Sequence, residues 1–171
     1  MKLIVASILI LSLVILFVFA LFPADISVSR VIRIGAPRDS VYSRIADMRQ
    51  WPRWNGLLNT ISPEGDGQMA ESETDSLTAR RGDVLVSLLP SLKDTVFTRF
   101  QQGNKSFNGE YVLTDDGPRA TLVYWTLQFH LHWYPWEKLA GMYYNRQLGP
   151  VMESSLLNLQ KTLENQAGDS H

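Results

Sequence analysis

The sequence contains no cysteine in its 171 residues. This absence excludes a disulfide scaffold, a zinc site built on thiolates, an iron–sulfur cluster and a cysteine nucleophile. An excess of positive charge is also missing, because 16 Lys and Arg residues stand against 17 Asp and Glu residues. Proteins that neutralise nucleic-acid phosphates need a basic surface, so we expect no nucleic-acid partner. The chain has no internal repeat either, which excludes a solenoid.

Motifs of the common catalytic and cofactor-binding sites are absent as well. The chain has no nucleophile elbow, no Walker loop, no dinucleotide fingerprint and no metalloprotease helix. We therefore predict no cofactor. The hydrophobic patterning of the chain is the remaining source of functional information.

The longest apolar segment is Leu3–Phe22, in which Ser7 and Ser12 are the only polar residues. At ~1.5 Å per residue, a helix of this length spans ~30 Å, the thickness of a bilayer hydrocarbon core. We predict that residues 1–25 form a retained single-pass membrane anchor. The alternative is a signal peptide cleaved after Ala20, although the apolar part of such a peptide is usually only ~7–15 residues long.

The orientation of this predicted anchor depends on two opposing signals. Arg30, Arg33 and Arg38 follow the segment and favour a cytoplasmic domain by the positive-inside rule. A very short N-terminal tail is instead the usual layout of a signal anchor, and a large folded domain can be translocated despite such charges. We predict a membrane localisation with an extracytoplasmic, periplasmic domain.

After the apolar segment, alternating apolar and polar residues predict a series of β-strands. The first is Ile26–Ile34, and Pro37 then opens a short helix. Further strands are expected at about Leu77–Arg81, Val84–Leu89, Thr95–Gln101, Ser106–Leu113 and Ala120–Trp133. The turns between these later strands are so short that neighbouring strands must be antiparallel.

The last two predicted strands share an apolar face that is rich in aromatic side chains. This face comprises Phe107, Tyr111, Leu113, Val123, Trp125, Leu127, Phe129, Leu131 and Trp133. Gly109 lies on it and leaves a gap that a neighbouring group can fill. Such stripes most often fill a core, but they also line ligand pockets.

The ionisable residues of these strands lie mostly on the opposite face. His130 and His132 are close enough along the strand to share a metal ion, but no third ligand is evident, so we interpret them as a polar strand face and predict no metal. For acid–base chemistry, only Tyr111 shares the apolar face. An unperturbed tyrosine, with a pKa of about 10, is a poor base. The sequence therefore favours a role other than catalysis.

A long amphipathic helix is predicted at the C-terminal end. Its apolar residues, Leu148 and Met152 among them, recur at spacings of three and four. Gly149 and Pro150 either kink this helix or mark its start, because proline cannot donate to the preceding turn. In the second case, residues 136–145 form a separate helical piece.

The order of elements predicts an α+β fold in which a curved antiparallel sheet wraps around the C-terminal helix, preceded by one transmembrane helix. The residues resemble the START-like family, also known as SRPBCC or polyketide cyclase-like domains, which have the helix-grip fold. The resemblance rests on Arg30-x-Ile32-x-Ile34-x-Ala36-Pro37, Val41-Tyr42, Asp47, Trp51 and Trp54 near the start, on Thr121-x-Val123-x-Trp125 in the last strand, and on Leu156-x-x-Leu159-x-Lys161-x-x-Glu164 in the last helix. We predict this domain over residues 26–166, followed by a frayed tail at 167–171.

The resemblance implies a deep cavity between the sheet and the C-terminal helix that holds a hydrophobic small molecule or a lipid. It does not by itself imply catalysis, because the same fold serves carriers, cyclases and regulators. The predicted cavity-lining residues are Trp54, Phe107, Tyr111, Val123, Trp125, Leu127, Phe129, Leu148 and Met152. Two alternatives remain open: a cyclase-like or hydrolase-like enzyme, and a protein-interaction module with a filled core. No particular protein partner is indicated.

Overall fold

The computed structural model of the protein describes residues 2–20, 25–57, 60, 77–81, 84–92, 94–130 and 135–168. The elements follow the order α1 (Lys2–Ala20), β1 (Asp25–Ile34), α2 (Arg38–Ile45), the 3-10 helix η1 (Met48–Arg53), β2 (Thr78–Arg81), β3 (Val84–Leu88), β4 (Thr95–Gln102), β5 (Lys105–Asp115), β6 (Thr121–His130) and α4 (Pro135–Gly168). This order is the α+β arrangement that the sequence predicts.

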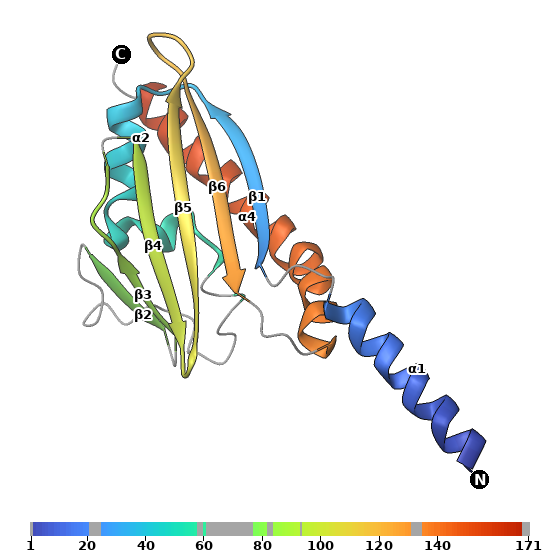
Figure 1. Ribbon diagram of the computed structural model, residues 1–171. Coiled ribbons are helices and arrows are strands. Elements are labelled where there is room, and N and C mark those ends of the chain that lie inside the picture. Colours follow the sequence, from blue (N-terminus) through green and yellow to red (C-terminus); the bar gives the residue numbers. More distant parts are fainter. Residues whose placement is uncertain are drawn as a thin grey trace.

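Six strands form one sheet in the order β1-β6-β5-β4-β3-β2, and each neighbouring pair is antiparallel. From β2 to β6 each strand pairs with the next one in the chain, as the short turns require. The first strand, β1, pairs with the last, with Ile34 opposite Thr121 and Asp25 opposite His130. The predicted curved antiparallel sheet is confirmed, and Figure 1 shows α4 running diagonally across one of its faces.

The burial of β6 follows the predicted alternation. Its buried residues are Thr121, Val123, Trp125, Leu127 and Phe129, and the residues between them are exposed or half-buried. Successive side chains of a strand point to opposite faces, so one face of β6 packs against the core and the other faces solvent. His132 and Trp133, which the sequence assigns to the same strand, lie outside the described residues.

Helix α4 is continuous, and Pro150 lies inside it. The alternative in which Pro150 begins the helix and residues 136–145 form a separate piece is therefore wrong. Proline removes one intrahelical donor, whereas the continuous helix buries a whole apolar stripe against the sheet. This stripe consists of Leu148, Met152, Leu156, Leu159 and Leu163. A Cβ at Gly149 would collide with the guanidinium of Arg30, so the glycine allows that strand residue to lie against the helix.

Helix α1 projects away from the sheet (Figure 1), and its large apolar side chains from Leu3 to Phe17 are exposed. Within the described residues, no helix combines the length and the apolar character that crossing a membrane requires. The predicted single-pass anchor is therefore wrong, and so is the membrane localisation with a periplasmic domain that was based on it. The prediction rests on the apolar composition of Leu3–Phe22, and the described helix in this segment is α1, Lys2–Ala20.

Candidate functional site

The inner face of the sheet, which packs against α4, carries most of the large aromatic side chains. Trp125 of β6 lies opposite Tyr111 of β5, and their rings are stacked with centroids 4.9 Å apart at an interplanar angle of 20°. Phe107 of β5 lies between two other rings, with its centroid 4.7 Å from that of Phe100 and 4.7 Å from that of Phe129. The aromatic stripe predicted from the last two strands therefore extends to β4.

A second wall of this interior is formed by η1 and the residue that follows it. Trp51 and Trp54 are three residues apart, the spacing at which side chains eclipse in a 3-10 helix. Their ring centroids lie 5.5 Å apart, and those of Trp51 and Tyr111 lie 6.0 Å apart. Trp51 Nε1 also donates a hydrogen bond of 2.9 Å to the carbonyl of Ile45, which ties the indole to the end of α2. We call Trp51, Trp54, Tyr111 and Trp125 the aromatic cluster.

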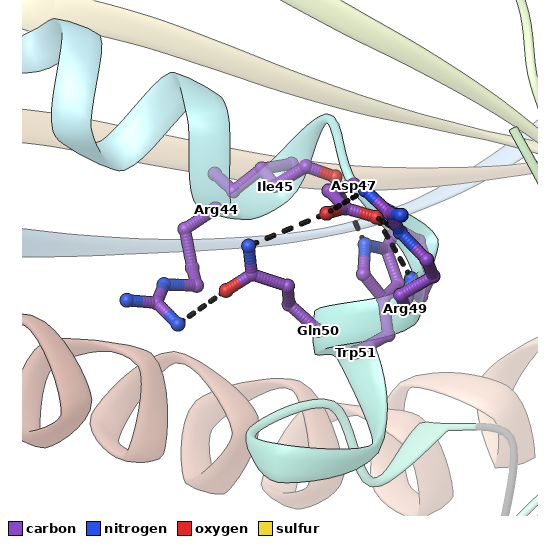
Figure 2. Close-up of polar contacts among 6 residues, drawn as sticks. All are labelled: Arg44, Ile45, Asp47, Arg49, Gln50 and Trp51. Atoms are coloured by element: carbon purple, nitrogen blue, oxygen red, sulfur yellow. Dashed lines mark hydrogen bonds and ion pairs between the residues drawn. The ribbon is translucent and has the colours of Figure 1, made fainter. Parts of the chain in front are cut away.

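A polar network fixes the start of η1, as Figure 2 shows. The Asp47 carboxylate accepts from the backbone N–H of Arg49 at 3.1 Å and from the Arg49 Nε and Nη2 atoms at 2.9 and 3.0 Å. Gln50 donates to the same carboxylate at 3.4 Å and accepts from the guanidinium of Arg44. The hydrogen bonds from Arg49 lower the pKa of Asp47 below its usual value. This cap holds η1, and with it Trp51, against the sheet.

Replacing Asp47 by alanine is expected to lower the free energy of unfolding by about 1 kcal/mol at neutral pH, because the helix loses its capping acceptor and ion pair. The folded state lowers the pKa of this carboxyl from 3.8, so the stability it contributes is present above that value and is lost as the pH falls through the folded-state pKa. Denaturant unfolding of wild type and Asp47→Ala should show a difference that shrinks below about pH 4. A difference that does not change with pH would contradict this role of the charge.

Polar side chains also lie inside this interior. Asn55 is buried, and its Nδ2 donates to the hydroxyl oxygen of Tyr111 at 3.3 Å. Ser155 of α4 accepts from the N–H of Gly56 at 2.9 Å and donates to the carbonyl of Val151 at 2.7 Å. These bonds connect the segment after η1 to both the sheet and the helix. Sequence reasoning missed Asn55 and Ser155, because the Asn-Gly pair indicates only a turn and the serine stands in no motif.

The environment of Tyr111 determines its chemistry. Burial raises the pKa of the Tyr111 phenol well above its usual value of 10.0, and this effect exceeds the lowering by the hydrogen bond from Asn55. The phenol is therefore protonated at neutral pH. In this state it hydrogen-bonds to neighbouring groups but does not remove a proton from a substrate.

The alkaline limit of stability is expected to depend on Tyr111. In the unfolded chain its phenol ionises near the ordinary pKa of 10.0, whereas burial keeps it protonated in the folded state. The stability that depends on the neutral phenol is therefore fully present below about pH 10 and is lost as the pH rises toward the folded-state pKa. Denaturant unfolding in steps up to about pH 11 should show a steeper alkaline loss for wild type than for Tyr111→Phe. Parallel curves for the two proteins would contradict the expectation.

A hollow of about 470 Å³ lies at the end of the sheet where β1 begins and β6 ends. The predicted site residues Phe107 and Phe129 line it, together with Ile26 and the exposed pair Asp25 and His130. His130 Nδ1 lies 2.7 Å from Asp25 Oδ1. Among the residues that the structure describes, no group of three or more His, Asp or Glu side chains is placed to hold a metal ion.

The nine predicted cavity-lining residues all lie in or beside one hydrophobic core. Phe107 is half-buried, and the other eight are buried. They come from the end of η1, from β5 and β6, and from α4. Their convergence on one interior agrees with the sequence pattern, and their contact with a ligand stays a prediction.

The family of the chain follows from its sequence. The family model described as polyketide cyclase / dehydrase and lipid transport matches residues 25–164. The chain belongs to this family. The START-like resemblance seen in the sequence is thereby confirmed, whereas no curated protein matches the chain.

Solved structures share the fold of this polyketide cyclase and lipid transport family member. A START superfamily protein from Mycobacterium smegmatis aligns with a TM-score of 0.60 at 18% identity, over 82% of this chain and 99% of that one. The di-domain ARO/CYC StfQ of the steffimycin biosynthetic pathway aligns with a TM-score of 0.59 at 15% identity, over 85% of this chain and 53% of that one. Norcoclaurine synthase from Thalictrum flavum aligns with a TM-score of 0.58 at 9% identity, over 84% and 96% of the two chains. At such identities the likeness establishes the START-like fold alone.

Proposed function

We propose that this protein binds a hydrophobic small molecule or a lipid in the interior between the sheet and α4. The observation that carries the proposal is the convergence of aromatic rings from β4, β5, β6 and η1 on one face of a curved sheet. The half-buried Phe107 contacts the rings of this interior and also lines the hollow at the sheet end. The description of the family includes lipid transport, which supports the same role.

The proposed ligand-binding domain comprises residues 26–166, with the nine core residues named above as its candidate contacts. Pockets for such ligands are lined mainly by hydrophobic and aromatic side chains, with few polar groups that set orientation. The interior has this composition, since Asn55, Thr98, Thr121 and Ser155 are the polar residues among the buried ones described.

Binding is favoured over the cyclase-like alternative by the state of Tyr111. A cyclisation that begins with proton removal needs a base, and the buried phenol is held in its protonated form. Asn55, which bonds to the Tyr111 hydroxyl among the described residues, carries a neutral amide and does not act as a base in place of the phenol. We therefore propose a binding role without catalysis at this site.

The direct test is binding of the uncharged apolar dye Nile red to the purified protein, followed by fluorescence, together with native mass spectrometry and solvent extraction of the purified protein. Phe107→Ala is expected to weaken probe binding by about tenfold, because it removes one of the aromatic rings proposed to contact the ligand. Tyr124→Ala is the matched control, since Tyr124 belongs to the neighbouring strand but faces outward and is 40% exposed. Absence of probe binding and of any co-purified ligand would favour the interaction module with a filled core.

A further inference from the structure

Three buried polar atoms of the interior have no hydrogen-bond partner within the described residues. They are Trp54 Nε1, Trp125 Nε1 and Thr98 Oγ1. Trp54 is 1% exposed, and Trp125 and Thr98 are fully buried. A buried donor without an acceptor loses its bond to water and gains nothing in return, so few such groups occur in native proteins and each needs an explanation.

The two unpaired indoles lie in the same aromatic cluster. The Trp125 ring stacks on Tyr111 at a centroid distance of 4.9 Å, and the Trp54 ring meets Tyr111 edge-on at 6.2 Å. Thr98 lies on the inner face of β4, opposite Gly109, which is two residues from Tyr111 on β5. The unpaired groups therefore come from three separate elements that wall one interior.

A third indole of the cluster shows that the environment does not by itself prevent pairing. Trp51 is as deeply buried as Trp125, and it also contacts Tyr111. Its Nε1 nevertheless donates to the carbonyl of Ile45 at 2.9 Å. The fold thus provides an acceptor for the indole of Trp51. Among the described residues it provides none for the indoles of Trp54 and Trp125.

We infer that the interior site selects an apolar molecule that carries a neutral acceptor oxygen, a carbonyl group, to which the indole N–H groups of Trp54 and Trp125 donate. The inference rests on the proposed function and adds the chemical class of the ligand. An indole nitrogen only donates, so the complementary group must be an acceptor. The four residues of the cluster carry no charge at neutral pH, and a buried carboxylate without a cation is costly, so a neutral carbonyl fits better than an anion.

The test compares two probes of nearly the same shape, 2-acetylnaphthalene and 2-isopropenylnaphthalene, which differ in a C=O against a C=CH₂ group. The measured quantity is the ratio of their affinities for the full chain, so the hydrophobic contribution of the common ring system cancels. This ratio is expected to fall by about tenfold in Trp54→Phe and in Trp125→Phe, because each variant removes one donor.

Trp51→Phe is the matched control. It removes the same atoms from an equally buried position of the same cluster, but its N–H is already bonded to Ile45. The affinity ratio is expected to stay unchanged in this variant. An equal fall in all three variants would assign the selectivity to ring shape and overturn the inference.

A measurement on the wild-type chain keeps the test independent of how the variants fold. With ¹⁵N-labelled tryptophan, two indole N–H resonances should move downfield when 2-acetylnaphthalene is added, and not when 2-isopropenylnaphthalene is added. If both probes bind and no indole resonance distinguishes them, the inference fails while the proposed function stands. If neither naphthalene binds, the inference fails, and the proposed function fails with it only when the dye binding and the co-purified ligand are absent as well.

Discussion

Replacing Trp51 by alanine is expected to lower the free energy of unfolding by about 3–5 kcal/mol, the range found for large buried side chains. Trp51 is fully buried, and its ring contacts those of Trp54, Phe100 and Tyr111. The truncation would therefore open a cavity bounded by three other rings. It would also leave the carbonyl of Ile45 without its donor. Denaturant unfolding monitored by circular dichroism measures the loss directly.

Two control variants separate the contributions to this loss. Trp51→Phe keeps a ring in the cavity and loses the donor, so we expect a smaller cost of about 1–3 kcal/mol. Tyr124→Ala removes a large side chain from the outer face of β6 and should change stability by no more than about 0.5 kcal/mol. A loss below about 1 kcal/mol for Trp51→Ala would mean that η1 contributes little to the core.

Gly109→Ala is expected to destabilise the domain by about 1–3 kcal/mol, which is the usual cost of overpacking a core. The cause is lack of space, since a Cβ at this position would collide with Thr98 Oγ1 and would lie 3.2 Å from Leu127 Cδ2 and from Phe100 Cε2. All three neighbours are buried side chains, and they lie on β4 and β6, the two strands that flank β5.

The same geometry predicts that a second substitution restores stability. Thr98→Ala removes the hydroxyl with which a Cβ at Gly109 would collide. The double variant should therefore lose less unfolding free energy than the two single variants lose in sum, by at least about 1 kcal/mol. The double-mutant cycle is measured by urea unfolding of the four proteins. Strict additivity would show that the strain in Gly109→Ala arises elsewhere, from Leu127 or Phe100.

The pattern of the strands was predictable because a single geometric rule governs it. Side chains alternate between the faces of a strand, so the sequence of β6 alone identifies Trp125 and Phe129 as inward-facing and Tyr124 as outward-facing. The gap at Gly109 was predictable for the same reason, and Thr98 is the group that fills it. The residue on the neighbouring strand could not be named, because strand register depends on pairing that the sequence does not state.

The contribution of η1 to the site was less predictable. The family resemblance indicates Trp54, but its contact with Tyr111 depends on how a short 3-10 helix folds back over the sheet. Asn55 reaches the Tyr111 hydroxyl from a position 56 residues earlier in the chain. No local pattern encodes such a distant pair. The unpaired indoles are also invisible in the sequence, since they are defined by the acceptors that their surroundings lack.

The predictions for the helices failed where a local signal was taken as decisive. The alternative in which the last helix starts at Pro150 is wrong, because α4 runs from Pro135 to Gly168 and its apolar stripe continues on both sides of the proline. Apolar composition likewise favoured a spanning helix at Leu3–Phe22, and the described helix does not meet the requirements for crossing a membrane.

The two outer strands of the sheet bear on how the protein behaves at high concentration. Strands with unpaired backbone groups act as templates for another chain and can seed fibrils, unless they are short, charged or covered. Strand β2 is only 4 residues long and ends in Arg80 and Arg81, so a second molecule would gain few hydrogen bonds there and would bring like charges together. Strand β1 is longer, but α4 packs against it. The ends of this sheet are thus poor starting points for intermolecular β-pairing, although its inner face is strongly hydrophobic.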